Sequence, residues 1–91
     1  MHTAFYATIS GRVQLVMYRD FVQRKARSLK VVGEVHNEPN GTVSVVAEGE
    51  QKNLEKLLTL LKHGPILARV KEVDVQWKDA TNIFTDFLIR F

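Results

Sequence analysis

The feature that most constrains the fold is the order in which the hydrophobic periodicity changes along the chain. Apolar and polar residues alternate from Thr3 to Ser10, which predicts a strand, and apolar residues then recur at helical spacing from Tyr18 to Leu29. Segments rich in valine, from Val31 to Asn37 and from Thr42 to Glu48, flank Glu38-Pro39-Asn40-Gly41. Proline fixes φ and Asn-Gly accepts positive φ at low cost, so these two segments are predicted to form a hairpin.

The second half of the chain repeats a helix followed by strands. Leucines from Leu54 to Leu61 form a narrow apolar stripe that ends at Gly64-Pro65, which predicts a helix closed by a glycine in the left-handed region. The alternation from Val73 to Asp79 predicts a strand, and Val70 stands out of phase with it, which predicts a bend or bulge just after that residue. A final alternation from Phe87 to Phe91 predicts a last short strand.

This order of elements predicts an α+β fold. Split βαβ units build a ferredoxin-like βαββαβ sandwich, in which one antiparallel sheet carries both helices on one face. The chain has 91 residues, which is enough for one such domain over residues 1–91 and too few for two cores. The same architecture serves enzymes, RNA-binding domains, metal carriers and regulatory domains, so the function has to be inferred from particular residues.

Composition excludes several classes of site. The chain has no cysteine, which excludes disulfides, a thiol nucleophile and thiolate metal centres and favours an intracellular, cytoplasmic location. His2, His36 and His63 show no metal-ligand spacing, so we expect no metal. The net charge of +3 permits binding of a small anion but does not indicate nucleic acid, and no apolar stretch is long enough for a membrane helix. A monomer is expected.

The segment between the first strand and the first helix is the candidate binding site. A strand that ends at Gly11 and a helix that starts near Tyr18 leave backbone N–H groups that the helix cannot pair. The helix dipole adds about half a positive charge there, and the guanidinium of Arg19 suits phosphate oxygens. The alternative interpretation is a solvated arginine in a first helical turn. Asn37 likewise has a local alternative, a hydrogen bond to the backbone of the turn that follows it.

Two spaced motifs connect these residues to a known family. The segment from Ser10 to Arg19 resembles the acylphosphatase signature, in which Gly-Arg-Val-Gln-Gly-Val precedes two variable residues and an arginine. The resemblance covers nearly the whole chain, in the matching order of elements. Its further parts are Val31-Val32-Gly33-Glu34-Val35-His36-Asn37, Gly41-Thr42-Val43, Glu48-Gly49, Gly64-Pro65, Ala68-Arg69-Val70 and the last strand with its phenylalanines.

The resemblance implies an enzyme that hydrolyses small acyl phosphates to a carboxylate and inorganic phosphate without metal or cofactor. Asn37 would hold the attacking water, and Arg19 would bind the phosphoryl oxygens together with the phosphate-binding loop. Backbone N–H groups of that loop would come from Gln14, Leu15, Val16, Met17, Tyr18 and Arg19. Phosphoryl transfer spreads charge over three oxygens, so fixed donors and positioning can supply most of the catalysis.

Leu15 is the main departure from the family pattern, because it stands where the family's phosphate loop has its second glycine. If this position needs positive φ, leucine costs roughly 1 to 2 kcal/mol of backbone strain, and its side chain could crowd the phosphate pocket. A relaxed loop that still binds phosphate, an impaired enzyme and a protein recruited to another role all remain open. Met17 and Tyr18 fill variable or aromatic positions, where no comparable problem is expected.

Other departures and alternatives concern charge and class. Glu34 replaces an aromatic residue, His36 replaces a lysine or arginine, and Glu38 directly follows Asn37, so weaker attraction of an anion is expected. A noncatalytic module that binds an anion or acyl phosphate is the alternative function. An RNA-binding sheet domain is disfavoured, because the strand from Thr42 to Glu48 has no aromatic residue on which a base could stack.

Overall fold

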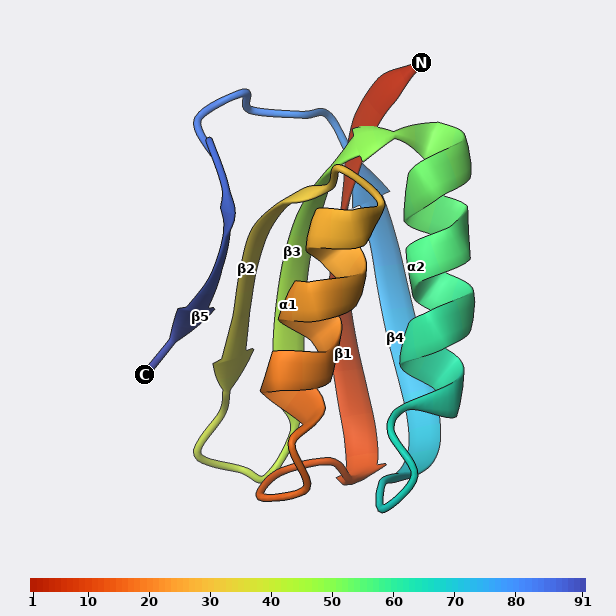
Figure 1. The fold of residues 1–91 in the computed structure, drawn as a ribbon, viewed down its shortest axis with the longest axis vertical. Helices are drawn as coiled ribbons and strands as arrows, with labels where there is room; N and C mark the ends of the chain where they lie inside the picture. The colour runs from red at the N-terminus through yellow and green to blue at the C-terminus, as the bar shows by residue number, and fades with distance from the viewer.

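The computed structural model describes residues 1–91 and shows two helices packed on one face of a five-stranded sheet (Figure 1). The predicted order of elements is confirmed, with boundaries that shift by one to three residues in most cases. The elements are β1 (His2–Arg12), α1 (Tyr18–Ser28), β2 (Val32–Asn37), β3 (Val43–Glu50), α2 (Gln51–His63), β4 (Arg69–Lys78) and β5 (Phe87–Arg90).

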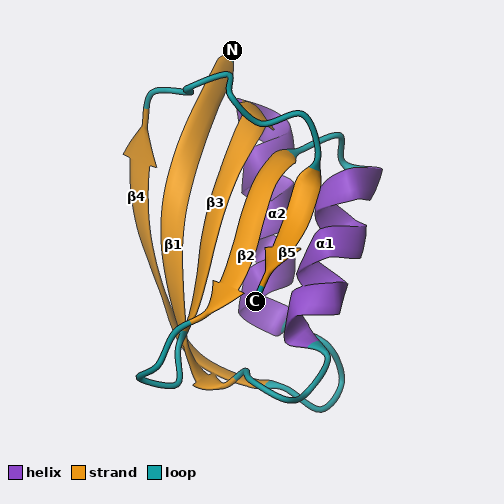
Figure 2. Ribbon diagram, turned by 90° about the vertical axis from the view of Figure 1, so that its left-hand side faces the viewer, coloured by secondary structure: helices purple, strands orange, loops and turns teal.

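The sheet has the strand order β4-β1-β3-β2-β5, and both helices lie on the same side of it (Figure 2). The four longer strands pair antiparallel with their neighbours, as predicted. The short strand β5 instead pairs parallel with β2, with Val35 opposite Ile89, so the complete sheet is mixed. The segment between β4 and β5 carries the chain from one edge of the sheet to the other, which brings β5 in alongside β2 in the same direction (Figure 1). None of the helices is long and apolar enough to cross a membrane.

Contacts with α1 hold β5 at the edge of the sheet. The guanidinium of Arg27 donates two hydrogen bonds to the carboxylate of Asp86, at 3.1 and 2.9 Å, and Gln23 donates to the carbonyl of Phe87 at 3.0 Å. The N–H of Phe87 and the hydrogen bonds from Arg27 lower the pKa of the Asp86 carboxyl. The last strand is thereby fixed beside the helix that follows the candidate loop.

The predicted hairpin turn between β2 and β3 is confirmed. The N–H of Glu38 donates to the carbonyl of Thr42 at 2.8 Å, and the side-chain oxygen of Asn40 accepts hydrogen bonds from both the N–H and the hydroxyl of Thr42. Gly41 has φ 93°, in the region that favours glycine. This turn lies at the same end of the molecule as the connection between β1 and α1 (Figure 2).

The predicted bulge lies where β1 and β4 meet. Ser10 pairs with Glu72 and Gly11 pairs with Val70, so Lys71 is the extra residue on β4. Gly11 has φ 118°, and a Cβ atom built there would lie only 2.1 Å from the carbonyl oxygen of Arg69. Glycine therefore permits the close approach of the two backbones at the point where β1 leads into the loop.

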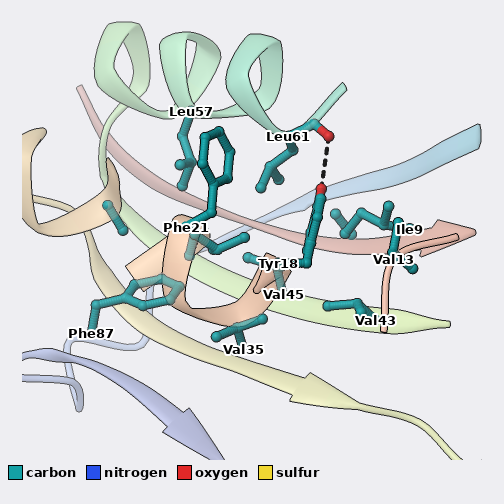
Figure 3. Close-up of a cluster of buried hydrophobic side chains, with 14 of the residues drawn as sticks. Ile9, Val13, Tyr18, Phe21, Val35, Val43, Val45, Leu57, Leu61 and Phe87 are labelled. Atoms are coloured by element: carbon teal, nitrogen blue, oxygen red, sulfur yellow. Dashed lines mark hydrogen bonds between the residues drawn. The ribbon is translucent and has the colours of Figure 1, made fainter. Parts of the chain in front are cut away.

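The core between the helices and the sheet also anchors the start of α1. Tyr18 is fully buried, and its hydroxyl donates a 2.7 Å hydrogen bond to the carbonyl of Leu61 near the end of α2 (Figure 3). Burial raises the pKa of this hydroxyl, so it remains a neutral donor. Gly64 ends α2 with the predicted positive φ, but its ψ of 178° is extended and not left-handed helical.

A buried carboxylate fixes the segment between β4 and β5. Glu48 accepts hydrogen bonds from the N–H and the hydroxyl of Thr81, at 2.9 and 2.7 Å, and from the N–H of Asn82 at 3.0 Å. Burial alone raises the pKa of Glu48, but these hydrogen bonds, together with the nearby His2, leave its pKa below the ordinary value. The ionised carboxylate therefore serves as the acceptor that holds this crossing segment.

Candidate functional site

The connection between β1 and α1 presents a row of free backbone donors. None of the N–H groups from Gln14 to Arg19 donates a hydrogen bond to another group of the protein, and the first helical hydrogen bond of α1 runs from Phe21 to Met17. The first N–H groups of a helix point along its axis with the positive end of the dipole. The segment thus has the donors that an anion requires, as the sequence predicted.

The backbone of this segment bends twice into the left-handed region. Leu15 has φ 62° and Met17 has φ 64°, while the residues on either side of each have negative φ. Alternation of this kind turns successive N–H groups toward a common point and forms an anion-binding nest. Position 15 therefore does have positive φ, although its residue is a leucine and not a glycine.

One sequence-based expectation about the loop was wrong. Met17 was expected to raise no problem comparable to that of Leu15, but this residue, the N-cap of α1, adopts the same strained left-handed conformation. Leu15 was considered as a side chain that could crowd the pocket; it is 98% exposed and is one of the residues that line the cavity beside the loop. The leucine therefore carries a backbone cost while its side chain packs little against the rest of the protein.

Gln14 ties the loop to the hairpin turn. Its side-chain amide donates to the carbonyls of Glu38 and Thr42, each at 2.8 Å. Both acceptors belong to the turn that follows Asn37, so one side chain sets the spacing between the loop and the end of β2. The sequence placed Gln14 in the loop for its backbone N–H, and its side-chain role was missed because the partners lie 24 and 28 residues away in the chain.

A cavity of about 250 Å³ opens beside the loop and brings the predicted site residues together. Arg19 at the start of α1 and Asn37 at the end of β2 both line it, although they are far apart in the sequence. Gln14 and Val16 do not line the cavity, since Gln14 reaches the turn and Val16 is buried in the core. The complete lining consists of Val13, Leu15, Met17, Tyr18, Arg19, Asp20, Asn37, Ile89 and Phe91.

The last strand holds the guanidinium of Arg19 in place. Its Nη1 atom donates to the carbonyl of Arg90 at 3.3 Å, and its Cζ atom lies 4.8 Å from the centre of the Phe91 ring. Arg19 takes part in none of the four ion pairs of the protein, so its positive charge is not neutralised by a carboxylate. A cation stacked on an aromatic face keeps its N–H groups available at its edge.

Asn37 presents an acceptor without a partner. Its side-chain oxygen is buried and accepts no hydrogen bond from the protein, and it is the one buried side-chain polar atom of which this is true. The local alternative, a hydrogen bond between the Asn37 side chain and the backbone of the turn, is therefore wrong; the side-chain oxygen of Asn40 accepts the hydrogen bond from the turn instead, from the N–H of Thr42. A buried acceptor without a partner in the lining of a cavity needs an explanation, and a bound molecule with an O–H group supplies one.

The acidic residues near the loop make other contacts. Glu34 pairs with Arg90 at 3.1 Å, and Glu38 accepts a 2.7 Å hydrogen bond from the hydroxyl of Ser44. Neither lines the cavity, and neither does His36. Asp20 does line it, which the sequence did not predict, and its carboxylate is paired with Arg24 at 2.9 Å.

Ile89 and Phe91 are the other lining residues that sequence reasoning missed. Alternation over the last strand was visible in the sequence, but its parallel pairing beside β2 was not. No group of three or more His, Cys, Asp or Glu residues is placed to hold a metal ion.

Comparisons with known proteins agree with this geometry. The family model described as Acylphosphatase matches residues 5–89. An acylphosphatase of Salinibacter ruber is 48% identical over 84 residues, which are 92% of this chain and 88% of that protein. One of Thermus thermophilus is 49% identical over 77 residues, with coverage of 85% and 88%. The crystal structure of acylphosphatase from Bacillus subtilis superposes with a TM-score of 0.94 at 30% identity and covers 100% of both chains.

Proposed function

Since this chain belongs to the acylphosphatase family and is an acylphosphatase, we propose that Arg19, Asn37 and the N–H groups from Gln14 to Arg19 form its catalytic site. The lining of one cavity supports this proposal. It includes an arginine without a carboxylate partner and a buried amide oxygen without a donor, beside six consecutive free N–H groups.

The loop binds the phosphoryl group of the substrate. Its N–H groups and the guanidinium of Arg19 donate to the phosphoryl oxygens, which carry the charge in both the bound substrate and the transition state. The carbonyl of Arg90 and the ring of Phe91 orient Arg19 before substrate arrives, and Gln14 fixes the loop. Donors that are already in place need no reorganisation during the reaction.

Asn37 orients the attacking water. Its side-chain oxygen accepts a hydrogen bond from the water, which leaves a lone pair of the water oxygen free to attack phosphorus. A new P–O bond forms from water, the bond between phosphorus and the acyl oxygen breaks, and the electron pair of that bond leaves with the carboxylate. Both water protons end on the phosphate, so the balance needs no proton acceptor, and an amide suffices at this position.

The leaving group explains the lack of a general acid in the proposed set. A carboxylate is stable as an anion at neutral pH, so it departs without being protonated. The remaining demand on the protein is to hold phosphoryl group and water in line, which the loop on one side and Asn37 on the other can meet.

The conformation at position 15 supports phosphate binding by the loop although the residue is leucine. Leu15 adopts the positive φ that a glycine would adopt, and its side chain is almost fully exposed. We therefore assign to Leu15 a cost in stability and not a loss of the site. The relatives support an enzyme over the noncatalytic binding module.

We also propose that residues 1–91 act as one domain, as a monomer in the cytoplasm, on small acyl phosphates and without a nucleic acid partner. The lack of cysteine suits a reducing compartment, and the net charge of +3 is small for binding to a polyanion. Sedimentation of the purified protein tests the oligomeric state.

Substitution of the two side chains tests the site. Arg19→Ala should lower kcat/KM for benzoyl phosphate by about 10³, and Asn37→Ala by about 10² to 10³, because each removes a preorganised contact to the reacting groups. Lys25→Ala is the matched control, since it removes a positive charge from the same helix away from the cavity. An Arg19→Ala variant that hydrolyses the substrate as fast as the Lys25→Ala control contradicts the proposal.

Phosphate binding provides an independent measurement. Titration with inorganic phosphate should shift the amide NMR signals of residues 14–19 in the unsubstituted protein and much less in Arg19→Ala. Shifts confined to other segments would place the anion elsewhere.

A further inference from the structure

Three apolar side chains stand exposed around the mouth of the cavity. Leu15 is 98% exposed, Phe91 95% and Met17 69%, and all three line the cavity that contains Arg19 and Asn37. They come from two separate parts of the chain, the loop before α1 and the residue that follows β5. The surface next to the phosphate-binding donors is therefore apolar.

The fold does not explain the two loop side chains. Leu15 and Met17 both adopt positive φ, where every residue with a Cβ atom is strained, and neither side chain belongs to the core. A glycine at either position would relieve the strain without loss of packing. Side chains that cost stability and remain exposed beside a binding site point to a role in binding.

In-line attack determines which part of the cavity receives the acyl group. The leaving carboxylate departs on the side of phosphorus opposite the attacking water. If Asn37 holds the water, the acyl group points away from Asn37, toward the remaining lining. Apart from Arg19 and Asp20, that lining consists of apolar residues and Tyr18, and Tyr18 is buried with its hydroxyl bonded to the carbonyl of Leu61.

We propose that Leu15, Met17 and Phe91 form an acyl-group subsite that selects acyl phosphates with a bulky apolar acyl group, such as an aromatic one, over acetyl phosphate. This inference rests on the proposed roles of Arg19 and Asn37. The guanidinium of Arg19 lies over the ring of Phe91, and the exposed part of this ring adds to the apolar surface. The acyl group covers the three side chains and loses water contact on binding.

The test compares kcat/KM for benzoyl phosphate and acetyl phosphate. Leu15→Ala, Met17→Ala and the double variant shorten the loop side chains while a Cβ atom keeps the backbone preference of an L-residue at both positions. Phe91 is left unchanged because its ring also orients Arg19. Ile83→Ala is the matched control, since Ile83 is 73% exposed and lies outside the cavity. A ratio between variants cancels the difference in intrinsic reactivity of the two substrates.

The double variant should lower the benzoyl-to-acetyl ratio of kcat/KM by about five- to twentyfold, each single variant should lower it by less, and the control should leave it unchanged. A ratio that stays within a factor of about two in the double variant overturns the subsite. An equal loss of kcat/KM on both substrates, together with weaker inhibition by inorganic phosphate, would also overturn the subsite. The side chains would then affect only the conformation of the loop. An unchanged ratio alongside an inactive Arg19→Ala variant refutes the subsite alone, whereas an active Arg19→Ala variant refutes the site itself.

Discussion

Replacement of Leu15 by glycine should stabilise the protein. The present φ of 62° costs a leucine roughly 1 to 2 kcal/mol relative to a residue without a Cβ atom. Glycine also gives the unfolded chain more conformational freedom, which lowers the free energy of unfolding by about 0.5 to 1 kcal/mol. No packing is lost, because the side chain is 98% exposed. From the middles of these two ranges, about 1.5 and about 0.75 kcal/mol, the net expectation is a gain of about 0.5 to 1 kcal/mol in the free energy of unfolding.

Thermal and urea unfolding measure this gain. For a domain of this size, about 0.5 to 1 kcal/mol corresponds to a rise in Tm of roughly 2 to 8 °C. Leu15→Ala is the matched comparison, since it removes nearly the same exposed side chain but retains the Cβ atom and hence the strain. Its stability should stay close to that of the unsubstituted protein.

The result that would refute this reasoning is a Leu15→Gly variant no more stable than Leu15→Ala. The loop would then relax around leucine without cost, or the leucine side chain would make stabilising contacts that its exposure excludes. A large rise in acetyl phosphate hydrolysis by the glycine variant would separately show that the leucine obstructs the site.

Three further predictions concern residues that support the loop and the sheet. Gly11→Ala should destabilise the protein by more than about 2 kcal/mol in urea unfolding, because the new Cβ atom would meet the carbonyl of Arg69 at a position with φ 118°; a normal midpoint would contradict the tight bulge. Tyr18→Phe should cost about 1 to 2 kcal/mol, since it removes the buried hydrogen bond to Leu61, and an unchanged Tm would show that this bond contributes nothing. Glu48→Gln should cost about 1 to 3 kcal/mol near neutral pH. Because the folded pKa of Glu48 lies below its unfolded value, its contribution is present above about pH 4.5 and fades as pH falls through the folded pKa. The difference in unfolding free energy between the two proteins should therefore shrink in acid, and a constant difference down to about pH 3 would be inconsistent with the lowered pKa.

Local sequence determined the elements and several of their junctions. The hairpin turn at Asn40-Gly41 and the bulge after Val70 were predicted, because turn residues and a break in alternation act over a few positions. The positions of Arg19 and Asn37 were inferred from resemblance to a family, and local chemistry alone favoured ordinary roles for both. Their presence in one cavity required the fold.

The strain at Met17 shows where local reasoning fails. Nothing in the residue type of Met17 indicates positive φ, since methionine rarely adopts it. The first residue of α1, Tyr18, is held in the core by its hydrogen bond to the carbonyl of Leu61. The conformation of Met17 follows from the path that the backbone must take from the end of β1 to this residue. The backbone of the loop is thus determined by the anchors on either side of it.

The sequence by itself determined the order of elements, the candidate loop and the residue types suited to phosphate, because periodicity, turn chemistry and motif spacing are local properties. Tertiary structure alone decided that β5 pairs parallel with β2, so that the Arg90 carbonyl and the Phe91 ring hold Arg19. It also decided that Glu34 and Glu38 find partners away from the cavity and that the Leu15 side chain stays exposed. These outcomes depend on contacts between segments distant in the chain, which no local pattern encodes.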